Sequence, residues 1–200
     1  NPTTGRLIVF DGSEWNSGLA LSPNVWTHVV LVRSNNTYIM YKNAVGAPPL
    51  ASSQALYQGT NTKISSAATT AFALGNIDEV RIYNRALTPA EIRQLYKAGS
   101  SFHPNVTNKS TIRNGLVGHW SFDGSDMGTT SASDASGQGN TGWLINGPKK
   151  SIGRIGQALN FDGVDDYVNA GSATSLDNIS PVTYSAWIYP RSYGESGSGT

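Results

Sequence analysis

IDEVRIYNRAL, residues 77–87, is the stretch that decides the fold. Val80 and Ile82 in it alternate with other residue types and share one face of an extended chain, which predicts a partly buried β-strand. The stretch runs into Thr88-Pro89-Ala90-Glu91, which offers a hydroxyl as N-cap, proline at the first helical position and a carboxylate that can bond back to the cap. Gly99 then supplies a left-handed stop. A strand followed by one short helix is therefore predicted.

On both sides of this stretch, short alternating or apolar runs recur between turn signals, which is typical of an antiparallel β-sandwich with many strands. We therefore expect an all-β fold with one short helix. The expected strands cover residues 5–10, 25–33, 36–42, 71–75, 77–83, 115–122, 141–145, 157–161, 167–170 and 181–189. Residues 100–114 are polar and irregular, so they are interpreted as a linker between segments 1–99 and 115–200.

Composition excludes several classes of protein. The 200 residues are 38% hydrophobic, enough for one sizeable core, and 14 Lys and Arg nearly balance 13 Asp and Glu. This balance argues against nucleic-acid partners, and no apolar run reaches the length of a membrane helix, so we expect no membrane insertion. Because there is no cysteine, disulfides and thiolate zinc sites are impossible. The start, Asn1-Pro2-Thr3, has neither initiator Met nor signal peptide, so we expect a piece of a larger protein.

Four stretches after the linker form a recognisable set: GLVGHWSFDG (115–124), DASGQGNTG (134–142), GQALNFDGVDDYV (156–168) and PVTYSAWIYP (181–190). They resemble the opening of a laminin-G-like jelly-roll domain of the bacterial branch of the concanavalin A-like lectin/glucanase superfamily. The closing half of the same pattern is found at residues 25–32, 38–43 and 77–87 with the helix after them. One departure is Asn43-Ala44, where the family has Asn-Gly, so a residue with a Cβ occupies a position that favours positive φ.

In this chain the closing half precedes the opening half, so the resemblance implies a jelly-roll sandwich in permuted order. Half a sandwich would expose an apolar face and open edges. Alternation places Leu116, Trp120 and Phe122 on one face of their strand. It likewise places Val80 and Ile82 on one face of theirs, so these two apolar faces can pack together. We expect the halves to dock as one sandwich here. In the intact parent we expect each half to pair instead with its missing partner in a neighbouring domain of the same chain.

The loop from Asp134 to Asn140 is a candidate metal site. A glycine-rich loop can wrap carbonyls around a hard cation while Asp and Asn side chains add oxygens, as calcium requires. The alternative is that Asp, Ser, Gly and Asn simply form consecutive tight turns.

Asp78 strengthens the calcium prediction. Alternation places it on the same strand face as Val80 and Ile82, so its carboxylate points toward the core. An unpaired charge there is costly, and a bound cation would offset that cost. Alternatively, Asp78 lies at the strand mouth in water, with Glu79 and Arg81 paired on the opposite face. The resemblance implies calcium between this strand and the early Asp loop. The predicted ligands are Asp78, Asp134, Asn140 and the Gly137 carbonyl.

Aromatic residues suggest a second kind of site. Trp187 and Tyr189 lie on the strand face opposite Tyr184, Ala186 and Ile188. If that face is open, their rings can stack on sugars; otherwise other segments cover them as a second core layer. Trp15, in a loop rich in Gly and Ser, is another candidate ligand-binding ring.

Catalysis is not expected. The glucanases of this superfamily carry Glu-x-Asp-x-Glu on one strand, and that triplet is absent here. We expect a non-catalytic carbohydrate-binding or adhesion module of an extracellular multidomain bacterial protein, with a glycan or surface protein as partner. The alternatives are a structural spacer repeat without a dedicated ligand and an accessory module of a glycoside hydrolase. Exposed Trp or Tyr rings beside polar groups would favour the lectin over the spacer.

Overall fold

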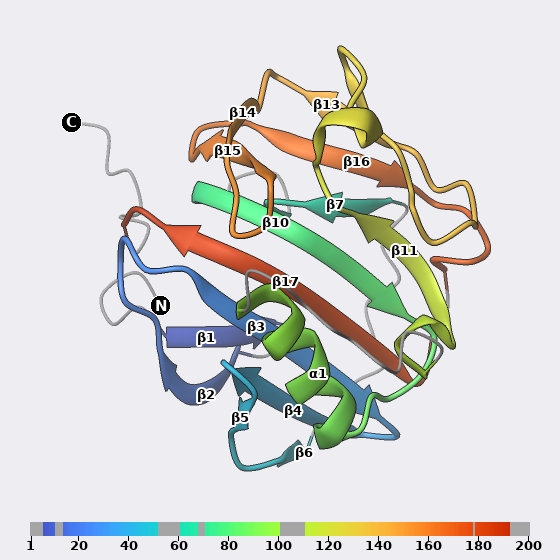
Figure 1. Ribbon diagram of the computed structural model, residues 1–200. Coiled ribbons are helices and arrows are strands. Elements are labelled where there is room, and N and C mark those ends of the chain that lie inside the picture. Colours follow the sequence, from blue (N-terminus) through green and yellow to red (C-terminus); the bar gives the residue numbers. More distant parts are fainter. Residues whose placement is uncertain are drawn as a thin grey trace.

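The computed structural model describes residues 6–10, 14–51, 61–67, 71–100, 111–177 and 179–192. These residues form antiparallel β-sheets and one α-helix, so the expected all-β sandwich with one short helix is confirmed (Figure 1). No helix among these residues is both long enough and apolar enough to cross a membrane.

The strands before the linker are β1 (Arg6–Phe10), β2 (Glu14–Ala20), β3 (Thr27–Ser34), β4 (Thr37–Lys42), β5 (Val45–Gly46), β6 (Leu50–Ala51), β7 (Thr62–Ile64), β8 (Ser66–Ala67), β9 (Ala71–Phe72) and β10 (Leu74–Tyr83). The strands after it are β11 (Leu116–Trp120), β12 (Ser131–Ala132), β13 (Gly142–Ile145), β14 (Lys149–Ile152), β15 (Gln157–Asp162), β16 (Tyr167–Gly171) and β17 (Val182–Pro190). The helix is α1 (Pro89–Ser100), and two 3₁₀ turns span Thr111–Arg113 and Gly124–Asp126.

One nine-stranded sheet runs in the order β14-β15-β10-β17-β3-β4-β5, with β11 joined to β10 and β6 to β4. A second sheet has the order β12-β13-β16-β7, and β1-β2 and β8-β9 form two-stranded sheets. The long strand β10 pairs with β17 and also with β15 and β11. Both larger sheets therefore combine strands from before and after the linker. That the order is a permutation of the family's pattern stays a prediction.

The main core contains the inward faces of β10 and β11. Val80 is paired with Trp120, and both are buried together with Ile82 and Phe122. The expected parity fails at Leu116, because the register shifts between Ile82 and Tyr83 and moves Leu116 to a second cluster. The two strands thus contribute to two separate cores.

The second cluster lies beneath α1, which crosses one face of the nine-stranded sheet (Figure 1). Ile92 and Leu95 of the helix are buried there against Val30 and Tyr83. The helix therefore covers a sheet face that would otherwise expose apolar side chains.

The start of α1 has the predicted reciprocal cap. Glu91 N donates to Thr88 Oγ1 (3.3 Å), and Thr88 N donates to Glu91 Oε2 (2.8 Å). Arg85 adds an ion pair at 2.6 Å, and its hydrogen bond is the main reason that the pKa of Glu91 falls to about 2. At the departure from the family pattern, Asn43 and Ala44 take positive φ values of 50° and 65°. The chain thus keeps the turn conformation despite the Cβ of alanine.

Thr183 gives a test of the contact between the two segments. It is fully buried, and its Oγ1 accepts a hydrogen bond from Leu87 N (3.0 Å) and donates one to Arg85 O (2.8 Å). Thr183→Val keeps the shape but removes both bonds, so we expect urea unfolding to show a loss of about 1–3 kcal/mol. Thr129→Val, at an exposed position, is the control. Equal stability of the two variants would contradict this role.

Candidate functional site

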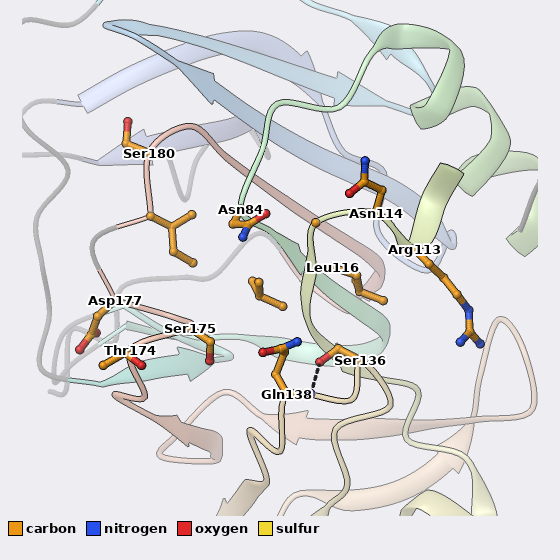
Figure 2. Close-up of a pocket in the computed structure, with 13 residues that line it drawn as sticks. Asn84, Arg113, Asn114, Leu116, Ser136, Gln138, Thr174, Ser175, Asp177 and Ser180 are labelled. Carbon is orange, nitrogen blue, oxygen red and sulfur yellow. Dashed lines mark hydrogen bonds between the residues drawn. The ribbon is translucent and has the colours of Figure 1, made fainter. Parts of the chain in front are cut away.

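A pocket of about 670 Å³ opens where β11 begins (Figure 2). Its volume lies within the range of about 300–1,000 Å³ that is usual for small-molecule sites. The lining residues are Asn84, Arg113, Asn114, Gly115, Leu116, Val117, Ser136, Gln138, Thr174, Ser175, Asp177, Ile179 and Ser180. Most of these side chains are amides and hydroxyls, with one guanidinium and one carboxylate. The pocket can therefore both donate and accept several hydrogen bonds.

Asp134 organises the loop that forms one wall of this pocket. Its Oδ1 accepts hydrogen bonds from His119 N (2.9 Å) and Ser136 N (2.8 Å). Its Oδ2 accepts from Ser136 Oγ (2.8 Å) and Asn140 N (3.0 Å). A carboxylate that bonds backbone N–H groups two residues on is the usual means of fixing a tight turn. Asp134 thus holds Ser136 and Gln138 at the pocket.

Asn140 clamps the same loop to the rest of the fold. The side chain is buried, and its Nδ2 donates to Val117 O (2.7 Å) and to Ser175 Oγ (3.0 Å). The carbonyl oxygen of Asn140 accepts from Trp120 Nε1 (2.9 Å). One residue therefore joins both loops that face each other across the pocket, which makes its walls rigid.

The four predicted calcium ligands do not all share hydrogen-bond partners. Asp134 and Asn140 share a hydrogen bond, and Gly137 lies between them with a φ of 91°. Asp78 has other partners, since its Oδ2 accepts hydrogen bonds from Arg154 N (2.7 Å) and Ile155 N (2.9 Å). Among the described residues, no hydrogen bond or ion pair joins Asp78 to Asp134, Gly137 or Asn140.

A bulge explains the position of Asp78. Glu79 has a φ of 53°, and the pairing of β10 with β17 shifts between Asp78 and Arg81. Alternation alone predicted that Asp78 shares the face of Val80. The shift reverses the alternation, so Asp78 lies on the opposite face. It lies opposite Trp187 in the neighbouring strand, on the side of the sheet that α1 covers.

Asp78 is nevertheless fully buried, and its Oδ1 has no hydrogen-bond partner among the residues that the structure describes. Burial, assisted by the charges of Glu79 and Asp123, raises the pKa of Asp78 to about 7 despite two N–H bonds that lower it. A buried carboxylate oxygen without a partner is the kind of ligand that a hard cation such as calcium binds. Asp78 therefore offers one free oxygen to the predicted metal, whereas both carboxylate oxygens of Asp134 already accept hydrogen bonds.

Glu79 has a different role. Its carboxylate pairs with Arg81 and accepts a hydrogen bond from His119 Nε2 at 3.0 Å. Burial alone would raise the pKa of Glu79, but the hydrogen bond from His119 and the charge of Arg81 hold it below its ordinary value. The Glu79–Arg81 pair considered from the sequence is therefore present, with His119 as a third member.

Trp187 is 2% exposed, so other segments cover its ring, as the alternative interpretation expected. Its ring stacks on Tyr96 at 5.7 Å, and Arg154 lies over it at 4.9 Å. Gly99 makes this possible, because a Cβ at that position would overlap the indole nitrogen. Neither face of the Trp187 ring is open to a sugar.

The other two aromatic candidates lie apart from Trp187. Tyr189 is half-buried, with its ring 5.5 Å from that of Trp26. Trp15 belongs to β2, but its side chain lies outside the described residues.

Sequence reasoning did not single out Trp143, which is 55% exposed on β13. The alternation of Gly142, Trp143 and Leu144 in a predicted strand was the available signal. Deciding which face stays open required the position of β13 in its sheet.

Comparisons with known proteins give one match. Residues 3–93 match a laminin G family model described as the concanavalin A-like lectin/glucanases superfamily. Comparison with curated proteins and with solved structures gives no match.

The raised pKa of Asp78 predicts how stability varies with pH. The unfolded chain releases this proton near pH 3.8 and the folded chain near pH 7, so burial of Asp78 costs progressively more stability as pH rises between these values. With chelator present, Asp78→Asn should remove this decline. At neutral pH its free energy of unfolding should exceed that of the unmutated protein by up to about 4 kcal/mol.

Urea unfolding across this pH window measures the difference. Asp165→Asn, at an exposed position, is the control for loss of a negative charge. Parallel pH profiles for the Asp78 variant and the unmutated protein would contradict the assignment.

Proposed function

We propose that this chain is a non-catalytic carbohydrate-binding module that binds its ligand in the pocket beside β11, because residues 3–93 match a family model described as the concanavalin A-like lectin/glucanases superfamily. We place it in an extracellular or cell-surface multidomain bacterial protein. The superfamily fits a carbohydrate-binding or adhesion role, and the lining of the pocket supports the former.

The lining of the pocket is the observation that carries this proposal. A sugar presents many hydroxyl groups, each of which donates and accepts. Asn84, Asn114 and Gln138 offer paired donor and acceptor groups, while Arg113 and Asp177 offer charge-assisted hydrogen bonds. Since the walls are held by buried hydrogen bonds, binding would cost little ordering of the protein.

The arrangement of carboxylates supports a non-catalytic role. Glycoside hydrolysis requires two carboxyl groups on either side of the scissile bond. Among the residues that line this pocket, Asp177 is the one carboxylate. Glu79 is buried and engaged by Arg81 and His119.

Binding to sugars gives the direct test. Against an array of glycans, the chain should bind a defined subset, and Gln138→Ala and Asp177→Ala should each weaken that binding about 10-fold through lost hydrogen bonds. Lys150→Ala, exposed on β14, is the control. Isothermal titration with the strongest glycan gives the dissociation constants.

Two results would contradict the proposal. Binding to no glycan favours the structural spacer or a protein partner. Binding that both pocket variants leave unchanged would move the sugar site to another surface.

We also propose a structural calcium at Asp78, supported by its buried, unpartnered Oδ1. Calcium should raise the melting temperature of the unmutated protein, and Asp78→Ala should abolish that rise. Because Asp134 has different partners, Asp134→Ala should lower the melting temperature yet keep the response. Thermal unfolding with calcium and with chelator measures both effects.

The outcomes separate three cases. Loss of the response in both variants would mean that Asp78 and Asp134 bind one calcium ion together, as the sequence predicted. A response that survives Asp78→Ala would move the ion to Asp162, Asp165 and Asp166, whose oxygens lie within 4.8 Å of one another. No response in the unmutated protein would exclude calcium.

A further inference from the structure

A second, smaller pocket adjoins the first. Its volume is about 250 Å³, and its lining residues are Gly139, Asn140, Thr141, Trp143, Asn169, Ala170, Gly171, Ser172 and Ala173. This is below the usual range for a whole small-molecule site, about 300–1,000 Å³. A space of this size suits one ring of a longer ligand.

The fold itself turns Trp143 outward. Gly142 before it faces the core, where a Cβ would come within 2.6 Å of Val168 Cγ1, and Leu144 after it packs on the main core. Alternation in β13 therefore leaves Trp143 on the solvent side, 55% exposed. A single exposed apolar residue is ordinary, but this ring also lines a pocket.

Polar groups flank the ring. Asn169 is the direct cross-strand partner of Trp143, so their side chains are neighbours on one face of the sheet. The Asn169 amide is held in place because its Oδ1 accepts from Gly171 N at 2.9 Å. Thr141 and Ser172 add exposed hydroxyls to the same pocket. An aromatic face with hydrogen-bonding groups at its edge matches a pyranose, which has apolar C–H faces and a rim of hydroxyls.

The second pocket is uncharged. None of its lining residues carries a charge, whereas the first pocket contains Arg113 and Asp177. A neutral sugar ring therefore fits the second pocket better than an acidic or basic one.

The two pockets meet along two loops. Gln138 lines the first and Gly139 the second, and likewise Thr174 lines the first and Ala173 the second. Figure 2 shows Gln138 and Thr174 among the residues that line the first pocket. The clamp residue Asn140 bridges to Ser175 at the junction, so the relative position of the pockets is fixed.

We infer that the ligand is an oligosaccharide of at least two adjoining units, with one unit in the polar pocket and a neutral pyranose stacked on Trp143. This inference rests on the proposed function. It names the class of ligand, an extended glycan rather than a single sugar.

Titration of Trp143→Ala tests the inference. The probes are cello-, manno- and galacto-oligosaccharides, each from the monosaccharide to the hexasaccharide. For the series that binds, removing the ring should weaken oligosaccharide binding roughly 3- to 10-fold and leave monosaccharide binding unchanged. Trp143→Phe should restore most of the affinity, because it keeps an aromatic face.

Tyr184→Ala is the matched control, since Tyr184 is also exposed but lies on β17 and lines neither pocket. The melting temperature of each variant shows that its fold is intact. Oligosaccharide affinity that Trp143→Ala leaves unchanged overturns this inference while the proposed function stands. An unmutated protein that binds no sugar of any length overturns both.

Discussion

The pairing of β10 with strands on both of its edges is the interaction on which the rest of the structure depends. Every buried backbone N–H and C=O group of this strand must find a partner. β17 supplies them along one edge, and β15 and β11 supply them along the other. All three partners lie after the linker. The same pairing brings Asn84, just past the end of β10, beside the start of β11, where the polar pocket opens.

Local chemistry was enough to predict the elements around β10. The alternation of Val80 and Ile82 and the capping sequence from Thr88 to Glu91 depend on neighbouring residues alone, and the structure contains both features. The side of the sheet that Asp78 occupies could not be predicted in this way. Glu79 adopts a left-handed conformation in which its carboxylate meets His119, forty positions along the chain. A bulge held by such a distant partner leaves no local pattern.

The candidate binding residues show the same limit. Trp187 and Trp143 are the same residue type in strands of similar pattern, yet one is 2% and the other 55% exposed. Alternation separates the two faces of a strand but does not say which face another element covers. The packing of α1 decides this for Trp187, because Gly99 lets the helix approach the indole closely. The polar pocket likewise contains residues from loops far apart in sequence. The sequence marked one of these loops, at Asp134, as a candidate metal site, and it did not predict the pocket.

The position of β10 has one more consequence. Since its partners come from the other side of the linker, the hydrogen bonds that unite the molecule do not require the two segments to be joined covalently. Residues 6–100 therefore leave both edges of β10 unpaired unless residues 111–192 lie against them, and the pocket beside β11 needs residues from both segments.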